Sequence, residues 1–154
     1  MKIVHFQTQY AAAFKELNQD WIEKYFKMEA EDYYALDHPQ ENIIDKGGYI
    51  LIALLDDVPV GACALKKMDH EIYDYELAKM GVSPDHQGKG IGRKLGEAIL
   101  ALAEEKNAKA IFLETNTKLQ PAIALYHKLG FQEVKIDSSP YERPNYCMEY
   151  LLDS

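Results

Sequence analysis

The sequence predicts an α+β fold of three layers, with a mixed, mostly antiparallel central sheet of six to seven strands and helices on both faces. Three observations predict it. The first half holds consecutive apolar segments joined by tight turns, which is typical of antiparallel strands. The second half alternates strand and helix patterns, which requires a parallel pair across a helical crossover. A length of 154 residues suits a single core, so we expect one domain over residues 1–154.

The N-terminal half contains short apolar runs separated by turn residues and one stretch with helical spacing. Apolar side chains three and four positions apart over residues 11–28 predict an amphipathic helix. The pair Asp56-Asp57 joins two apolar runs and predicts a tight hairpin. Gly81 would weaken a regular strand, so we expect a bulge or a close backbone approach there. The predicted strands of this half are residues 3–6, 49–55, 58–65 and 72–82.

The C-terminal half contains two segments with helical spacing, each followed by a short apolar run. The first helix is expected to start at Ile91 and to end in the polar residues 104–107. The second is expected to open at Pro121 and close at Gly130, since proline suits the first turn of a helix and glycine its end. The strands on either side of the first helix should then be parallel. The predicted strands of this half are residues 110–113, 131–136 and 146–151, with a loop at residues 138–140.

Composition and charge exclude several classes of function. The chain is 47% hydrophobic and 27% charged, as ordinary globular proteins are, which excludes disordered and collagen-like classes. The net charge of −8 is a poor match to a polyanion, so we expect neither nucleic acid nor an anionic membrane as a partner. Most of the negative excess lies before residue 85, and residues 29–45 hold six acids without one Lys or Arg.

The cysteines, the histidines and the start of the chain bear on compartment and metal binding. Cys63 and Cys147 are far apart and form no CxxC motif, so we expect buried thiols in a reducing compartment and a cytoplasmic protein. The first residues turn polar too soon for a signal peptide, and the longest apolar run, residues 49–55, is too short to span a membrane. The five histidines are scattered, so no metal site is predicted.

A glycine-rich turn between a strand and a helix is the most informative segment. Residues 82–94 read Val-Ser-Pro-Asp-His-Gln-Gly-Lys-Gly-Ile-Gly-Arg-Lys. Unpaired backbone N–H groups at the positive end of a helix dipole favour a phosphate, and Lys89, Arg93 and Lys94 add positive charge. A dinucleotide pattern fails because it needs glycine at Arg93, and a Walker pattern fails because no Gly-Lys pair here precedes Ser or Thr. We expect His86, beside the turn, to be an exposed loop residue.

The turn fits the pattern Gln-x-x-Gly-x-Gly from Gln87 to Gly92, and here the sequence resembles the GNAT superfamily of acyl-CoA-dependent N-acyltransferases. Residues 82–84 and 121–131 match the same family, and with the order of elements the resemblance covers nearly the whole chain. It implies acetyl-CoA as co-substrate, with the pyrophosphate on the turn and the pantetheine arm along the main chain of residues 80–82. The implied cofactor-binding residues are Met80, Gly81, Val82, Gln87, Gly88, Lys89, Gly90, Ile91, Gly92, Arg93 and Tyr126.

The resemblance also implies catalytic residues. Tyr126 stands at the family's general-acid position, where its hydroxyl would approach the coenzyme sulfur, although its helical spacing equally fits a core residue. Glu114, twelve residues earlier, is the first candidate for the general base, Glu76 is the second, and ordered water is a third route for the proton. Without a bulge, Glu76 would share a strand face with Met80. Leu119 stands where many members have a cofactor-binding asparagine, so that contact is not expected here.

The resemblance places the acceptor groove beside the first helices and the last strand pair. The aromatic residues expected to line it are Trp21, Tyr25 and Tyr33. The acidic run of residues 29–45 belongs to the same part of the chain, so we expect a cationic acceptor, a primary amine on a small molecule, a peptide or a protein. The loop that holds Tyr141, Arg143 and Tyr146 offers the opposite possibility, recognition of a carboxylate.

Three functional interpretations follow from these patterns. The first is an N-acetyltransferase, a monomer or homodimer, that moves an acetyl group from acetyl-CoA to a primary amine by direct attack in a ternary complex. The second is a catalytically silent acyl-CoA-binding sensor or interaction module, against which the presence of both Tyr126 and Glu114 argues. The third is an unrelated domain for another phosphate ligand, against which the failed nucleotide patterns argue.

Overall fold

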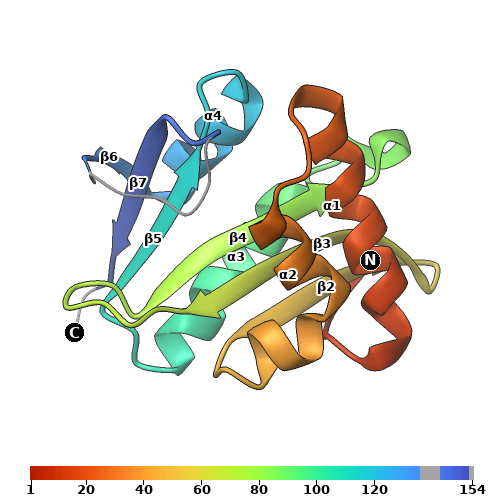
Figure 1. Ribbon diagram of the computed structural model, residues 1–154, viewed down its shortest axis with the longest axis horizontal. Helices are drawn as coiled ribbons and strands as arrows, with labels where there is room; N and C mark the ends of the chain where they lie inside the picture. Colours follow the sequence, from red (N-terminus) through yellow and green to blue (C-terminus); the bar gives the residue numbers. More distant parts are fainter. Residues whose placement is uncertain (136–142, 153–154) are drawn as a thin grey trace.

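A central sheet with helices on both faces makes up the protein (Figure 1). Within residues 1–135 and 143–152, which the computed structural model describes, seven strands form the sheet and four α-helices cover it. The strands are β1 (Lys2–His5), β2 (Tyr49–Leu55), β3 (Val58–Lys67), β4 (Tyr75–Val82), β5 (Ala110–Thr115), β6 (Gln132–Val134) and β7 (Tyr146–Leu151). The helices are α1 (Ala11–Tyr25), α2 (Ala30–Asp37), α3 (Ile91–Glu105) and α4 (Gln120–Leu129). Shorter helical turns occupy Thr8–Tyr10, Gln40–Ile44 and Pro84–His86.

The strand order confirms the predicted fold class. The strands lie in the order β1-β2-β3-β4-β5-β7-β6, and each neighbouring pair is antiparallel except β4 and β5. The parallel pair arises because α3 carries the chain from the end of β4 back to the start of β5, as a crossover connection must. The sheet is therefore mixed and mostly antiparallel.

Apolar residues on both faces of the sheet bury it between the helices. Ile50 and Ile52 of β2 pack in one core cluster with α1 and α2, whereas Leu51 and Ala53 pack in a second cluster with α3. Neighbouring residues of a strand point to opposite faces, so a strand that is covered on both sides needs apolar residues at every position. This explains the unbroken apolar run at residues 49–55, which is a buried strand as predicted.

Turn residues fix two element ends where the sequence predicts them. Asp56 and Asp57 have φ values of 50° and 64°, the left-handed pair that a two-residue type I′ hairpin needs. The predicted hairpin between β2 and β3 is confirmed. Gly130 has a φ of 110° and closes α4, a conformation that favours glycine.

Other element ends differ from the predicted ones by a few residues. α1 ends at Tyr25 rather than at residue 28, because Phe26 leaves the helix with an extended backbone. β4 begins at Tyr75, three residues later than predicted. The strand predicted at residues 131–136 is the three-residue β6, and its last predicted residue and the loop at residues 138–140 lie outside the described part of the chain.

β4 contains both irregularities that Gly81 led us to expect. The register between β3 and β4 shifts between Ala62 and Ala64, because β4 bulges at Lys79, whose φ is 52°. Gly81 itself is the point where α1 approaches the strand, since a Cβ there would lie only 2.6 Å from the carbonyl oxygen of Leu17. The helix can therefore cross β4 at this distance only over a glycine.

Because the bulge is present, the condition under which Glu76 and Met80 would share a strand face is not met. Leu77 and Met80 both pack in the core cluster beneath α3, although regular alternation would send residues three apart to opposite faces. The extra residue of the bulge places Met80 on the same face as Leu77. Glu76 and Met80 therefore lie on opposite faces of the sheet.

β4 and β5 pair only at their first residues and then diverge. Tyr75 pairs with Ile111 and Glu76 with Phe112, and no later pair joins the two strands in the described residues. Figure 1 shows the strands separating towards their C-terminal ends, with α4 on one side and the end of α1 on the other. An interrupted ladder leaves main-chain groups of both strands without their strand partners.

The two cysteines are free thiols, as the sequence predicts. Cys63 is fully buried in β3, and Cys147 is half-buried in β7. Burial raises the pKa of both thiols, so they are protonated at neutral pH. In the described ranges, none of the helices has the length and apolar character needed to cross a membrane.

Candidate active site

A cavity of about 470 Å³ opens where β4 and β5 diverge, a size typical of small-molecule sites. The glycine turn, α4, the end of α1 and the segment before β7 complete its walls. The predicted site residues that line it are Trp21, Tyr25, Glu76, Met80, Gly81, Val82, Gln87, Gly88, Gly90, Ile91, Gly92, Glu114 and Tyr126. Residues predicted separately for cofactor, catalysis and acceptor therefore share one cavity.

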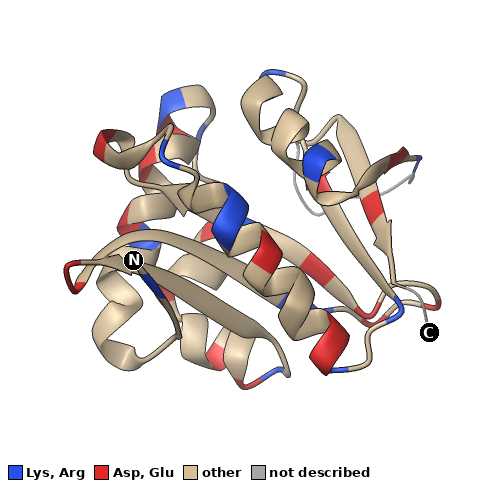
Figure 2. Cartoon of the chain, turned by 180° about the vertical axis from the view of Figure 1, so that it is seen from behind, with Lys and Arg blue, Asp and Glu red and all other residues tan. Residues whose placement is uncertain are grey.

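Three predicted site residues, Lys89, Arg93 and Tyr33, are not part of the cavity lining. Lys89 is exposed, and Arg93 is 57% exposed with its Nε 3.8 Å from Oε2 of Glu97, one turn further along α3. Figure 2 shows this basic start of α3 and the acidic positions that follow it. Tyr33 is 43% exposed on α2, with Nζ of Lys15 6.0 Å from its ring centre. The two cations are therefore exposed next to lining residues of the turn without lining the cavity themselves, and Tyr33 belongs to the outer surface.

The glycine turn forms an open cradle at the start of α3. Gly88 and Gly90 have φ values of 81° and 78°, the left-handed conformation that only glycine adopts at little cost. Apart from each glycine and its chain neighbours, no described heavy atom lies within 4 Å of the position that a Cβ would take at either residue. Gly90 is the N-cap of α3, so the unpaired N–H groups of the first turn and the positive end of the helix dipole face this space. The cradle has the chemistry of an anion site.

His86, next to the cradle, differs from the sequence prediction. It is half-buried rather than exposed, and it lines the cavity. Its Nδ1 is buried and has no hydrogen-bond partner within the described residues. The expectation of an exposed loop residue is therefore wrong for His86.

Tyr126 is at once a core residue and a cavity residue. It is only 9% exposed, and its ring meets Phe131 edge-on at a centroid distance of 6.0 Å. It also lines the cavity from α4, so the expected core residue reaches the site as well, and its role as general acid stays a prediction. Burial, with a smaller effect of nearby Cys63, raises the pKa of the Tyr126 hydroxyl well above its ordinary value. The hydroxyl therefore keeps its proton at neutral pH.

Glu76 and Glu114 lie near each other at the cavity. Glu76 pairs in register with Phe112, and Glu114 follows two residues later on the same face of β5. Both carboxylates also raise the pKa of Cys147, after the larger effect of its burial, which places all three groups within electrostatic reach. Desolvation raises the pKa of Glu76, and Lys66 and Lys79 only partly oppose this shift. A raised pKa makes a carboxylate a stronger base.

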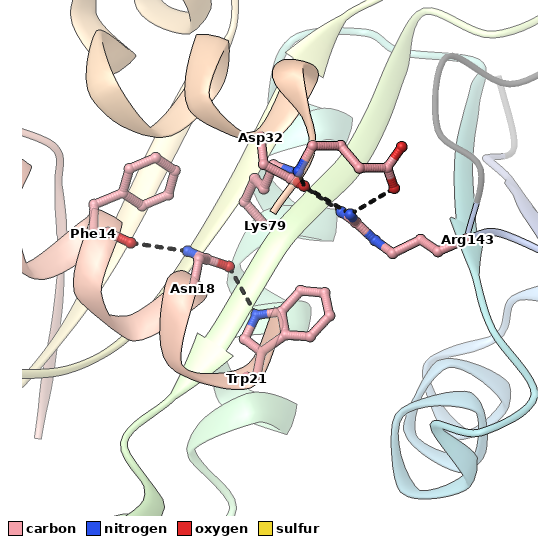
Figure 3. A network of polar contacts seen from close by, with 7 residues as sticks. Phe14, Asn18, Trp21, Asp32, Lys79 and Arg143 are labelled. Atoms are coloured by element: carbon pink, nitrogen blue, oxygen red, sulfur yellow. Dashed lines mark hydrogen bonds and ion pairs between the residues drawn. The ribbon is translucent and has the colours of Figure 1, made fainter. Parts of the chain in front are cut away.

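Aromatic side chains from the end of α1 form another wall. The indole Nε1 of Trp21 donates to Oδ1 of Asn18 at 3.0 Å, and the fully buried Asn18 donates to the carbonyl oxygen of Phe14 at 3.0 Å (Figure 3). This chain of hydrogen bonds fixes the orientation of the indole. Tyr25 stands 43% exposed at the rim, and Phe26, which the sequence analysis did not single out, lines the wall beside it.

Arg143 is committed to carboxylates of the protein rather than offered to a substrate. Its guanidinium donates to both Oδ atoms of Asp32, at 2.6 and 2.7 Å, and to Oε2 of Glu29 at 3.2 Å (Figure 3). Its side chain is only 12% exposed. Arg143 therefore does not provide the substrate-carboxylate site that the sequence offered as a possibility. Tyr146 meets a histidine of α4 at 3.4 Å, and Tyr141 lies outside the described residues.

The acidic run at residues 29–45 is partly neutralised by ion pairs. Glu29 and Asp32 bind Arg143, and Oδ1 of Asp37 lies 2.6 Å from Nζ of Lys15. The run therefore exerts a weaker field than its charge count predicts, because paired charges largely cancel at a distance. Glu76 and Glu114 are the carboxylates that reach the cavity itself.

The end of β5 leads into α4 through a loop held by Asn116. Its Nδ2 donates to the carbonyl oxygen of Arg143 at 2.6 Å, and its Oδ1 accepts from the N–H of Lys118 at 2.9 Å. Asn116 and Leu119 both line the cavity, and Leu119 is the N-cap of α4 without a capping side chain. Asn116 therefore serves the loop, while Leu119 contributes an apolar surface.

The diverging parallel strands, the cradle and the mixed sheet define the fold of acyl-CoA N-acyltransferases. The model of the Acetyltransferase (GNAT) family matches residues 12–131. The chain therefore belongs to the GNAT family of acetyltransferases, which confirms the resemblance seen in its motifs.

Comparisons with individual proteins agree with this membership. Over 62 residues the chain is 40% identical to the N-alpha-acetyltransferase RimI of Mycobacterium tuberculosis, a match that covers 40% of this chain and 37% of that protein. The chain spans less than two thirds of the length of the curated relatives it matches. An acetyltransferase of the GNAT family from Staphylococcus aureus Mu50 superposes with a TM-score of 0.88 at 23% identity, with 99% of each chain covered.

A further neighbour was solved with a ligand. The PaiA N-acetyltransferase from Thermoplasma acidophilum, in complex with coenzyme A, superposes with a TM-score of 0.73 at 17% identity. The superposition covers 99% of this chain and 100% of that chain. At these identities the likeness shows the shared fold.

Proposed function

We propose that this protein is an acetyl-CoA-dependent N-acetyltransferase that moves the acetyl group to a primary amine by direct attack in a ternary complex. The observation that carries the proposal is the cavity between β4 and β5, in which the glycine cradle, Tyr126 and two carboxylates meet. Family membership supports it, as do the N-alpha-acetyltransferase name of a relative and the coenzyme A bound to a structural neighbour.

The cavity offers a suitable contact to each part of acetyl-CoA. The pyrophosphate would bind the N–H groups of the cradle at Gly88 and Gly90. Because β4 loses its pairing with β5 after Glu76, the main chain of residues 80–82 can pair with the amide groups of the pantetheine arm. Lys89 and Arg93, exposed beside the lining residues of the turn, would attract the phosphates over a longer distance.

The reaction needs a neutral amine, a polarised thioester carbonyl and a proton for the departing thiolate. The amine nitrogen attacks the acetyl carbonyl carbon, the N–C bond forms, and the C–S bond breaks with its electron pair on sulfur. One proton passes from the amine to the general base, and one passes from the Tyr126 hydroxyl to the sulfur. The raised pKa of Tyr126 suits this role, because an acid must still hold its proton at the working pH.

The acceptor half of the cavity suits a cationic amine. Glu76 and Glu114 supply negative charge in the cavity, and Trp21, Tyr25 and Phe26 add apolar ring surface to the same lining. The attacking amine must lose a proton first, so a carboxylate next to the binding place can serve both recognition and catalysis. The amine can belong to a small molecule or to a peptide terminus.

A screen of primary amines with acetyl-CoA tests the proposal directly. Release of free coenzyme A thiol, followed with a thiol reagent, should rise with cationic amines and should fall as salt is added, because screening weakens the attraction. Coenzyme A binding without thiol release for any amine would instead indicate an acyl-CoA sensor. Thermal stabilisation by ATP or NADH but not by coenzyme A would overturn the proposal altogether.

The pH dependence of catalysis should identify the base. Glu114 is the first candidate from the sequence, but the raised pKa of Glu76 leads us to expect Glu76 as the base. The value of kcat/KM should then fall on the acid side with an apparent pKa above the ordinary glutamate value. The sign follows from the shift, because a carboxylate with a raised pKa becomes protonated, and useless as a base, at a higher pH. Glu76→Gln should remove this acid limb and lower kcat/KM by about 10²-fold or more.

Glu114→Gln is the matched variant, since it neutralises the neighbouring carboxylate in the same cavity. It should keep the acid limb if Glu76 is the base. An acid limb that survives Glu76→Gln and disappears in Glu114→Gln would assign the base to Glu114. A limb that survives in both variants would leave the proton transfer to water.

A further inference from the structure

A buried carboxylate on α2 binds a cation from each half of the cavity. Oδ1 of Asp32 lies 2.6 Å from Nζ of Lys79 and 2.6 Å from Nη2 of Arg143, while Oδ2 accepts from Nη1 of Arg143 at 2.7 Å. Oδ2 also accepts the backbone N–H of Glu29 at 2.9 Å, as part of the capping box that starts α2 (Figure 3). The carboxylate is therefore saturated with donors from three segments.

The charges of this cluster depend on one another. The side chains of Asp32 and Lys79 are 0% and 4% exposed, so neither charge has water around it. Burial would raise the pKa of Asp32, but hydrogen bonds from Arg143 and the charge of Lys79 outweigh it and lower the pKa to about 2. Burial lowers the pKa of Lys79, and Asp32 opposes that shift. Breaking a buried pair leaves a charge without compensation, which is strongly unfavourable.

Lys79 connects this cluster to the cofactor strand. It holds the left-handed φ of 52° at the bulge of β4, a conformation that residues with a Cβ avoid. In a regular strand its side chain would follow Leu77 onto the α3 face, but the pair with Asp32 holds it on the opposite face, towards α2. Fixing the bulge in turn fixes Met80, Gly81 and Val82, which line the cavity directly after it.

Arg143 connects the same cluster to the acceptor half. Its Cζ lies 6.0 Å from the ring centres of both Trp21 and Phe26, so the guanidinium packs against both rings of the aromatic wall. Its carbonyl oxygen is held by Asn116 at the end of β5, while its side chain is held by Asp32 on α2. Arg143 therefore connects the loop after β5 to α2.

Asp32 itself does not line the cavity, although Lys79 and Arg143 both do. We propose that Asp32 is a positioning residue that sets both halves of the active site, fixing the cofactor strand through Lys79 and the aromatic acceptor wall through Arg143. The acceptor half of this statement rests on the proposed function. The residues involved lie 47 and 111 positions from Asp32 in the sequence.

Coenzyme A and the single tryptophan provide two readouts that need no knowledge of the acceptor. Asp32→Asn keeps the shape of the side chain and removes its charge. We expect its coenzyme A Kd, measured by calorimetry on the folded variant, to rise about tenfold, since small displacements of binding groups have effects of this size or larger. Trp21 is the only tryptophan of the chain, so its emission reports the position of the Arg143 guanidinium, and it should shift in Asp32→Asn.

Two further variants test the cofactor half and the acceptor half of the site separately. Each keeps Asp32 paired with one cation, so they also serve if Asp32→Asn fails to fold. Lys79→Met should raise the coenzyme A Kd and leave the Trp21 emission unchanged. Arg143→Lys keeps the charge but loses the planar fork, so it should shift the Trp21 emission and leave the Kd near the wild-type value. The matched control is Asp37→Asn, which breaks a surface ion pair of the same 2.6 Å length on the same helix and should change neither readout.

A purely structural role would lower the melting temperature alone. The three variants are Asp32→Asn, Lys79→Met and Arg143→Lys. If they only melt at lower temperatures, while their coenzyme A Kd and Trp21 emission equal those of the wild type, Asp32 is not a positioning residue. If the wild-type protein itself does not bind coenzyme A, the proposed function fails, and the cofactor half of this inference fails with it. Normal binding by the wild type with equal binding by all variants overturns this inference and leaves the proposed function standing.

Discussion

Replacing Tyr126 with phenylalanine should lower kcat by about 10²- to 10⁴-fold, the range typical of a lost acid or base group, with little change in coenzyme A affinity. The substitution removes only the hydroxyl, and the ring that packs against Phe131 stays in place. Without a proton donor the thiolate must leave as an anion inside a cavity whose walls are mostly apolar, which is unfavourable. Steady-state kinetics with an amine found in the screen, together with calorimetry of coenzyme A, measures both quantities.

Tyr150→Phe is the matched control for this variant. Tyr150 lies on β7 and also packs against the Phe131 ring, at a centroid distance of 5.4 Å, but it does not line the cavity. The control therefore removes a hydroxyl from the same aromatic cluster and should leave kcat unchanged. An unaltered turnover and pH profile in Tyr126→Phe would remove Tyr126 from the mechanism and leave it as a core residue.

The parts of the fold that the sequence predicted well depend on local signals. The hairpin at Asp56-Asp57, the closure of α4 at Gly130 and the cradle around Gly90 each need a left-handed residue at a fixed place in a short segment. The parallel pair followed from the order of strands and helices, because a helical crossover allows few other connections. Such features can be deduced from residues next to one another in the chain.

The parts that the sequence did not predict depend on contacts between distant segments. A bulge or a close approach was expected at Gly81, but the position of the bulge at Lys79 was not, because a bulge is set by the neighbouring strand and by the packing of α1 and α2. The acidic run predicted a negative electrostatic potential that would attract the acceptor, but part of its charge is paired with Lys79 and Arg143. A charge count cannot show which charges are paired.

The glycine turn agrees with the predicted site at some residues and differs at others. The cavity includes its glycines and Gln87 but not Lys89 or Arg93, because side chains of neighbouring residues at a helix start point in different directions. The part that each of these residues takes in cofactor binding stays a prediction. The half-burial of His86 was not predicted from the sequence.

Gly90→Leu should weaken coenzyme A binding by roughly 100-fold or more, which corresponds to about 3 kcal/mol. Gly90 has a φ of 78°, and beyond its chain neighbours no described heavy atom lies within 4 Å of the position of a Cβ there. A leucine would therefore project into the space proposed for the pyrophosphate. It would also strain the backbone by about 1–2 kcal/mol, because a side chain crowds the carbonyl oxygen in this conformation. Calorimetry gives the affinity, and thermal melting gives the cost to stability.

Gly47→Leu separates these two effects of the substitution. Gly47 has a φ of 95° and lies outside the cavity, where a Cβ would meet only the flexible side chain of Lys67, at 3.6 Å. This variant should carry the same kind of backbone strain, so its melting temperature should fall as in Gly90→Leu while its coenzyme A affinity stays at the wild-type value. Equal affinity in Gly90→Leu and wild type would mean that the pyrophosphate does not bind at the cradle, since a leucine there could not leave an occupied anion site undisturbed.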